Sequence, residues 1–279
     1  MSPFSEMYIR HHSFVGKRLR ALLSLLVVCL ALLAFSKPLY AATITIVDGD
    51  STTLPTADTY TDGYIQEHLT ITGSLTIATT DAVDDIRVEP NVEITWTTGS
   101  ALLLIAHNNI VITGTIQHNG PADGSGGVYL VADSDGDQNG DVLIGDPSQP
   151  NAVAVGSRHG LTSVQAHNVT LQAGNGTNAN YAQLGFRTLN EGEAYAVTGS
   201  IAVTATGSVT GLAGELEGNY VQVGHGGYNG DLDPDGDFSG SITISATQTI
   251  AFLAGSGDDA YAQVGHGGNN AQGNFSGDH

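Results

Sequence analysis

Residues 220–227 read YVQVGHGG and residues 261–268 read YAQVGHGG, and these two stretches decide the fold. A shorter copy, YAQLGF at residues 181–186, precedes them, so the motif recurs at spacings of 39 and 41 residues. The flanking sequence recurs with it, because GSIAVTAT at 199–206 matches GSITISAT at 240–247. A fixed period of this size is typical of a solenoid, in which each unit buries its apolar face against its neighbour.

Apolar and polar residues alternate along most of the chain after residue 42, which predicts short strands bounded by Gly, Asn and Asp. The predicted strands include residues 43–47, 69–72, 74–78, 92–96, 109–116 and 241–246. In the last of these we expect Ile242 and Ile244 to point inward and Thr243 and Ser245 outward. No stretch of ten or more residues after residue 42 has helical spacing.

We therefore predict an all-β fold, a right-handed parallel β-helix. A propeller is the alternative, but its blades need four strands joined by hairpin turns, whereas each unit here holds about three. We expect each forty-residue unit to make two coils of about twenty residues.

The first 42 residues have the order of a secretory signal peptide. Basic residues at 10–20 precede the apolar stretch ALLSLLVVCLALLAF at 21–35, and small residues follow at Ala41 and Ala42. A membrane anchor is the alternative, but this stretch is shorter than the roughly 20 residues that span a bilayer. We predict that residues 1–42 are removed on export and that no transmembrane segment remains in the mature chain.

Two further regions are predicted after the signal. Residues 43–160 form a β-rich region with an acidic loop, and residues 161–279 form the repeats, truncated at the carboxyl end. In the preceding unit, the residues that match 276–277 open a new strand. We therefore expect the sequence to be a fragment of a longer protein, with natural truncation as the alternative.

The charge distribution excludes several classes of protein. Five of the eight basic residues but only one of the 28 acidic residues precede residue 43, which leaves three Arg against 27 acids. A nucleic-acid binder needs a basic face, so no nucleic-acid partner is expected. Cys29 is the only cysteine, which excludes disulfides and zinc–thiolate sites.

Two loops place side-chain oxygens at every second position, a pattern that suits a hard cation such as calcium. Neither loop has the Glu that closes an EF-hand, and a solvated turn is the alternative reading of both. The candidate ligands are Asp133, Asp135, Asp137, Asn139 and Asp141 in the first loop, and Asp231, Asp233, Asp235 and Asp237 in the second.

Aromatic residues recur at equivalent positions of the repeats. His225 and His266 are expected to stack in a ladder rather than to act in catalysis, since a catalytic histidine is not expected in successive copies. Tyr181, Tyr220 and Tyr261 predict a second ladder, and we expect Trp96 to be a packing residue.

The chain also resembles a known family. The leader, WTTGSALLLIA at 96–106, NIVITGTI at 109–116 and the QVGHGG units are similar to large filamentous haemagglutinin-type bacterial exoproteins. Those proteins are surface adhesins with β-helical shafts, exported by two-partner secretion or as autotransporters. The resemblance implies a secreted or outer-membrane-associated protein at the cell surface, with export machinery and a host or matrix ligand as partners.

These observations favour a non-enzymatic structural and adhesive surface protein that mediates attachment. One alternative is a calcium-dependent matrix or surface-layer component. Another is a β-helical polysaccharide-degrading enzyme, which needs a basic residue or a matched pair of carboxylates. The pairs Asp84–Asp85 and Asp258–Asp259 are sequence neighbours, and neighbours on a strand point to opposite faces.

Overall fold

The computed structural model describes residues 43–52, 55–56, 58–81, 83–148, 152–188, 196–228, 237–269, 271 and 274–276. Residues Ala41–His279 form one compact unit. The predicted signal peptide lies outside the described residues. Within the described part of the chain, no helix is both long enough and apolar enough to cross a membrane.

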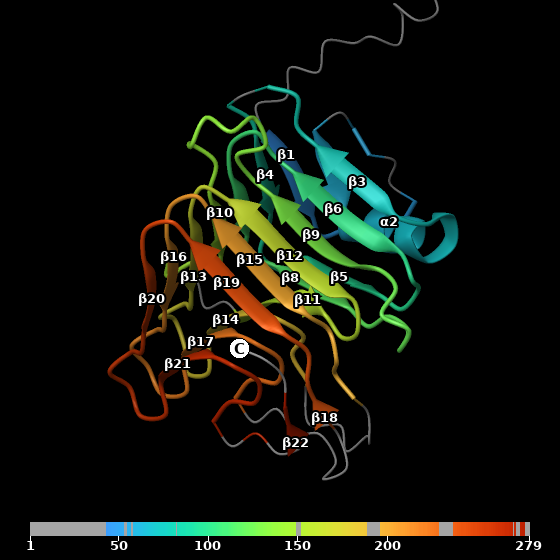
Figure 1. Ribbon diagram of the computed structural model, residues 1–279. Coiled ribbons are helices and arrows are strands. Elements are labelled where there is room, and N and C mark those ends of the chain that lie inside the picture. The colour runs from blue at the N-terminus through green and yellow to red at the C-terminus, as the bar shows by residue number, and fades with distance from the viewer. Residues whose placement is uncertain are drawn as a thin grey trace, which may run out of the picture. The chain divides into compact units, whose positions relative to one another are not determined.

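The described residues are mostly β and form three large parallel sheets, here named A, B and C (Figure 1). Sheet A has eight strands, and sheets B and C have six each. In chain order, the strands of sheet A are β1 (Thr43–Val47), β2 (Thr59–Thr61), β4 (Asp85–Val88), β7 (Ile110–Ile112), β10 (Val142–Ile144), β13 (Val169–Gln172), β16 (Val209–Leu212) and β20 (Ile250–Leu253).

Sheets B and C share this regular arrangement. Sheet B contains β3 (Leu75–Ala78), β6 (Ala101–Ile105), β9 (Gly127–Val131), β12 (Leu161–Ala166), β15 (Ile201–Ala205) and β19 (Ile242–Ala246). Sheet C contains β5 (Glu93–Trp96), β8 (Thr115–His118), β11 (Ala152–Ser157), β14 (Tyr181–Leu184), β17 (Tyr220–Val223) and β21 (Tyr261–Val264). Two short strands, β18 (Asp237–Phe238) and β22 (Asn274–Phe275), pair with each other.

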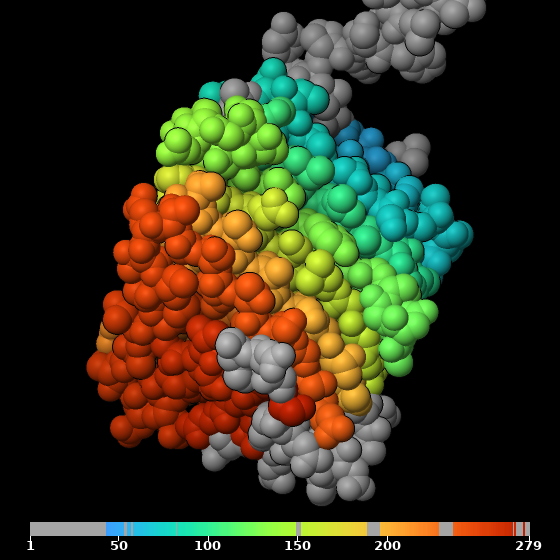
Figure 2. Space-filling model, viewed as in Figure 1, coloured from blue at the N-terminus to red at the C-terminus, as the bar shows by residue number. Residues whose placement is uncertain are grey.

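From β3 onward the chain visits sheets B, A and C in turn, and every described strand pair is parallel. Figure 1 shows the strands of sheet B side by side in chain order, and the colours of Figure 2 change in the same order across this face. This path is compatible with the predicted parallel β-helix. All three sheets run through the boundary predicted between residues 160 and 161.

One sequence repeat corresponds to one circuit of the three sheets. Tyr181 pairs with Tyr220, and Tyr220 pairs with Tyr261, so the register of sheet C follows the sequence repeat. The prediction of two coils per repeat was wrong. Each repeat supplies one strand to each of the three sheets, and the repeat that begins at Tyr220 also contains β18, which lies outside them.

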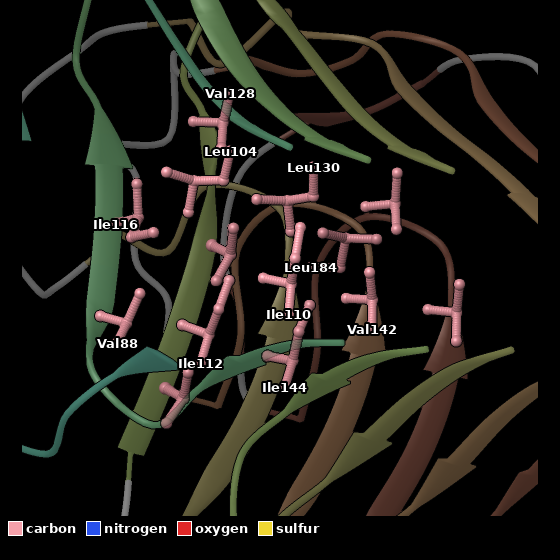
Figure 3. Close-up of a cluster of buried hydrophobic side chains, with 14 of the residues drawn as sticks. Val88, Leu104, Ile110, Ile112, Ile116, Val128, Leu130, Val142, Ile144 and Leu184 are labelled. Atoms are coloured by element: carbon pink, nitrogen blue, oxygen red, sulfur yellow. The ribbon is translucent and has the colours of Figure 1, made fainter. Parts of the chain in front are cut away.

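The core lies between the three sheets and is filled by alternate residues of each strand, as the pleat requires. Figure 3 shows Leu104 and Leu130 of sheet B, Ile112 and Ile144 of sheet A and Ile116 of sheet C among these buried side chains. The expected orientation in β19 is confirmed. Ile242 is buried and Ile244 packs against the core, whereas Thr243 and Ser245 are exposed.

One predicted strand is a helix. Residues 69–72 belong to the π-helix η1 (His68–Thr72), which continues directly from the α-helix α2 (Asp62–Glu67). Thr61 caps α2, because its hydroxyl oxygen accepts a hydrogen bond from the Tyr64 N–H at 3.2 Å. Ile65 and Leu69 are fully buried, four residues apart, and this helical spacing was missed among the alternating residues around it.

The connections from sheet C to sheet B differ in length along the chain. They span residues 97–100, 119–126 and 158–160 in the early circuits, but 185–200 and 224–241 in the later ones. Phe186, Val197 and Phe238, from the two long connections, form a small apolar cluster of their own. The outer face of sheet C is correspondingly buried at β17, where all four residues have little exposed surface.

Candidate functional site

A groove of about 580 Å³ lies over the outer face of sheet C, where the connections are short. Its lining combines aromatic rings, threonine hydroxyls, side-chain amides and two charged groups. The residues that line it are Thr70, Glu93, Thr95, Trp96, Thr97, Thr115, Gln117, Asn119, Ala154, Tyr181, Phe186 and Arg187.

Strand β11 creates the hollow because its outward residues are small. Val153 and Val155 enter the core, so Ala154 and Gly156 lie on the other face of the strand. A β-carbon on Gly156 would lie only 2.3 Å from the carbonyl carbon of Gly185 in the next strand row. That position therefore requires glycine, and the sheet has no side chain there to fill the groove.

Tyr181 and Arg187 form one wall of the groove. The guanidinium carbon of Arg187 lies 4.4 Å from the centre of the Tyr181 ring, a cation–π contact. The Arg187 Nε donates to the Tyr220 hydroxyl at 3.1 Å, and its backbone N–H donates to Gln117 Oε1 at 3.0 Å. These contacts fix the guanidinium beside the aromatic ring.

On β5, Glu93 and Thr95 face the groove, whereas the Trp96 ring points into the core and is held rigidly. Its indole Nε1 donates to the Ser100 carbonyl at 2.9 Å, and its ring stacks on His118 with centroids 4.8 Å apart. The indole is almost fully buried, which confirms the packing role predicted for Trp96. Only a small part of its surface borders the groove.

The groove has the composition of a binding site rather than of a matched acid–base pair. Glu93 is the one carboxylate among its lining residues. Asp84 and Asp85, the nearest sequence pair, do not face the groove. Asp85 Oδ1 instead accepts hydrogen bonds from Asn108 Nδ2 and from the Asn109 N–H, both at 2.9 Å.

The first acidic loop brings three of its five candidate ligands together. One carboxylate oxygen from each of Asp133, Asp135 and Asp137 lies within 4.8 Å of the others, so this group could hold a cation. Positive φ angles at Asp133 and Gly136, 56° and 75°, turn the backbone so that the carboxylates converge. Hydrogen bonds from Asn139 lower the pKa of the exposed Asp137.

Asp141 belongs to a different structure, a ladder of Asp and Asn side chains between sheets B and A. Asp141 Oδ1 accepts from both the backbone and the side-chain nitrogen of Asn168, each at 2.9 Å. Asn109 Oδ1 accepts from the Asp141 N–H at 3.0 Å, and Asn168 Oδ1 accepts from the Ser208 N–H at 2.9 Å. The structure therefore places Asp141 among turn-stabilising residues and not in the Asp133 cluster.

The remaining candidate ligands are placed as follows. The Asn139 side-chain nitrogen donates to Asp137 Oδ2 at 2.8 Å, so this end of the amide turns toward the cluster. In the second loop, Asp231, Asp233 and Asp235 lie outside the described residues. Asp237 lies in β18, with its side chain exposed.

The two predicted aromatic ladders are confirmed. Tyr181 and Tyr220 stack with centroids 5.1 Å apart, and Tyr220 and Tyr261 stack at 4.8 Å. The rings of His225 and His266 lie 4.9 Å apart and almost parallel. The rings stack directly because the register is parallel.

His225 is held in one neutral form by two backbone groups. Its Nδ1 accepts from the Phe186 N–H at 3.0 Å, and its Nε2 lies 2.7 Å from the Gly199 carbonyl, to which only a protonated nitrogen can donate. Burial lowers the pKa of His225 to about 3. Protonation of Nδ1 would place its new N–H against the Phe186 N–H, where it has no acceptor, so the charged form of the ring is disfavoured.

The groove was not predicted from the sequence. A usable signal was present in AVAVGS at 152–157, where the outward positions hold only alanine and glycine while neighbouring strands carry larger groups. Two of the three arginines after residue 42 also lie next to the groove. Arg187 lines the groove, and Arg158 Nη1 donates to Oδ1 of the lining residue Asn119 at 3.0 Å.

Comparisons of the chain with protein-family models, with curated proteins and with solved structures found no match. The fold and the groove therefore carry the functional argument.

Proposed function

We propose that this chain is a secreted or cell-surface protein of structural and adhesive function, built on a right-handed parallel β-helix and without enzymatic activity. Its role is to attach a bacterial cell to a host or matrix surface. The proposal includes removal of residues 1–42 during export and an association with the outer membrane through export machinery.

The observation that carries the proposal is the exact correspondence between sequence repeat and structural circuit. Tyr181, Tyr220 and Tyr261 occupy one row of sheet C, so each repeat adds one equivalent layer. Such a stack presents a long, regular outer surface for contact with a partner. The handedness follows from the general preference of parallel strand connections for right-handed crossovers.

The groove also favours binding over catalysis. Its one carboxylate, Glu93, has no second carboxylate beside it among the lining residues, whereas hydrolysis of a glycosidic bond by the usual route uses two. The polysaccharide-degrading alternative therefore has no observation among the described residues in its favour.

Adhesion tests the proposal directly. Chain collected from the culture medium is coated on beads, which are washed over epithelial cells, matrix proteins and immobilised polysaccharides. We expect retention on at least one of these surfaces and competition by free chain. Beads coated with heat-unfolded chain are the control, and equal retention of the two kinds of bead on every surface would defeat the proposal.

A second candidate is a calcium-dependent matrix or surface-layer component. The observation in its favour is the convergence of Asp133, Asp135 and Asp137. Three carboxylates supply part of the oxygen shell that calcium requires, and backbone carbonyls and water supply the rest in such loops. In this case the cation orders the loop between β9 and β10.

A further inference from the structure

We propose that the groove on sheet C binds an acidic oligosaccharide, with a sugar carboxylate placed against the Arg187 guanidinium. This inference rests on the proposed adhesive function and specifies its ligand. It depends on the shape of the groove, on the chemistry of its lining and on the distribution of positive charge in the chain.

The shape suits a linear ligand. The groove volume, about 580 Å³, falls within the usual range of small-molecule sites. A second hollow of about 230 Å³ shares Glu93 and Thr115 with it and extends along the same sheet toward Asn91. The two hollows therefore adjoin each other along sheet C, an arrangement that fits a chain of sugars better than a single compact molecule.

The lining matches the two kinds of surface that a sugar presents. Its C–H faces pack on aromatic rings, and the partly buried ring of Tyr181 supplies one. Its hydroxyls both donate and accept hydrogen bonds, as does the side-chain amide of Asn119, which lines the groove. The Thr115 hydroxyl makes no hydrogen bond to another described residue, so it is available to a ligand.

The charges select an acidic sugar and orient it. Residues 43–279 carry three Arg against 27 acids, so an anion is repelled from most of this surface. Arg187 places a cation in the groove, and Arg158 contacts its rim through Asn119. No described acid forms an ion pair with Arg187. Because its Nε is used by Tyr220, the remaining guanidinium N–H groups are the donors for a carboxylate.

Glu93 acts in the opposite sense. It lines both hollows, so a carboxylate is disfavoured where the two adjoin. A ligand with one acidic sugar next to neutral sugars therefore binds in one direction, with its acidic end at Arg187.

Isothermal titration calorimetry gives a direct readout of binding in the groove. The test titrates the protein with trigalacturonate, trimannuronate and a hyaluronan tetrasaccharide, each compared with its neutral methyl ester, and follows the heat of each injection. We expect saturable change with at least one acid, and binding at least ~10-fold weaker for its ester, as one lost charged hydrogen bond implies.

Three variants make the test specific. Arg187→Gln should bring the affinity for the acid down to that for the ester. Thr115→Tyr, on a strand face that accepts aromatic residues, should fill the groove and abolish both signals. Arg87→Gln removes an exposed arginine of sheet A and should behave as wild type.

Two results would overturn the inference. One is the absence of binding heat with all six saccharides, and the other is equal affinity for every acid and its ester. The outcome is separable from that of the adhesion experiment. If beads adhere but no saccharide binds, the proposed function stands without this ligand. If a saccharide binds but no beads adhere, the ligand is retained and the function is rejected.

Discussion

The two halves of sheet C have the same inner face and different outer faces. Strands β5, β8 and β11 expose a groove floored by Ala154, whereas β17 is buried on both faces, with Tyr220 and Gln222 fully covered. The inner rows of β5, β8, β11 and β17 are buried and mostly apolar, with His118 and Ser157 as the polar members, so the core does not cause the difference. It arises from the connections, which are short at 158–160 and long at 185–200 and 224–241.

This comparison shows how a repetitive fold gains a local site. The strands set a uniform stack, and the connections decide which part of its surface remains open. The open half is therefore free to bind, whereas the covered half contributes to stability. Substitutions on the two halves should separate these roles.

The largest effect is expected for Tyr220→Ala in the covered half. Tyr220 is fully buried between two stacked rings, and its hydroxyl donates to Gln183 Oε1 at 3.0 Å. Its removal leaves a cavity and an unpaired amide oxygen, which should lower the free energy of unfolding by about 3–5 kcal/mol. Urea denaturation measures this.

Thr115→Ala in the open half is the matched control. Thr115 lines the groove and is only partly buried, so removal of its hydroxyl and methyl groups should change the free energy of unfolding by less than about 1 kcal/mol. Similar losses for the two variants would show that the halves do not differ in the way described.

A second effect, intermediate in size, concerns pH. Burial holds the pKa of His225 at about 3, and the nearby His266 and His159 add to the lowering. In the unfolded chain this histidine binds a proton near pH 6.5, whereas in the folded chain it stays neutral until the pH is near 3. The free energy of unfolding therefore decreases as the pH falls from about 6.5 toward 3. The slope is about 1.4 kcal/mol per pH unit for this one group, or about 2 kcal/mol between pH 6.5 and 5.

His225→Phe is the variant that isolates this contribution, because Phe186 already occupies the equivalent position of the preceding repeat. It should be less stable at pH 7, since the Phe186 N–H loses its acceptor, but its stability should depend less on pH. Urea denaturation between pH 7 and 5 measures both. An unchanged slope in the variant would assign the pH dependence to other groups, among them the buried His118.

The smallest effect is expected for calcium at Asp133, Asp135 and Asp137, which lie in the early circuits. Without a cation these carboxylates repel one another, and a modest site with Kd on the order of 10⁻⁴–10⁻³ M would reverse the repulsion. Calcium at about tenfold above Kd should then stabilise the fold by about 1.4 kcal/mol. Thermal unfolding in calcium, in magnesium and with chelator measures the shift.

The control is the double variant Asp135→Ala with Asp137→Ala, which should unfold at the same temperature in calcium and in chelator. If the wild-type protein also unfolds at the same temperature in calcium and in chelator, the loop binds no calcium and is a solvated turn.

Much of the fold was predictable because its cause is local and repeated. The alternation of apolar and polar residues predicted which face of strands such as β19 points inward. The repeated motifs predicted the ladders that contain Tyr220 and His225. The number of circuits per repeat was not predicted correctly, because a strand pattern alone does not show which sheet each strand joins. The helix that carries Ile65 and Leu69 was missed because Leu69 and Ile71 also alternate as in a strand, although Ile71 is exposed.

The groove could not be predicted in the same way, since it depends on contacts between distant residues. Arg187 meets Gln117 across 70 positions of sequence, and Gly156 is significant only because Gly185 lies against it. The acidic loop was predicted in part. Alternate spacing identified Asp133, Asp135 and Asp137 as candidate ligands. It could not show that Asp141, at the same spacing, belongs instead to the ladder with Asn168.

The one-circuit-per-repeat register has a mechanical consequence. Adjacent layers are joined by the apolar core, by rows of hydrogen bonds and by ring stacks, such as those between Tyr220 and Tyr261. A load that pulls the chain ends apart would break one layer at a time and release its full contour at once. With 39 to 41 residues between equivalent positions, each rupture would free roughly 130–140 Å of chain at about 3.4 Å per residue. A protein that tethers a cell under flow would thus lengthen in discrete steps, each dissipating energy, before the attachment itself is strained.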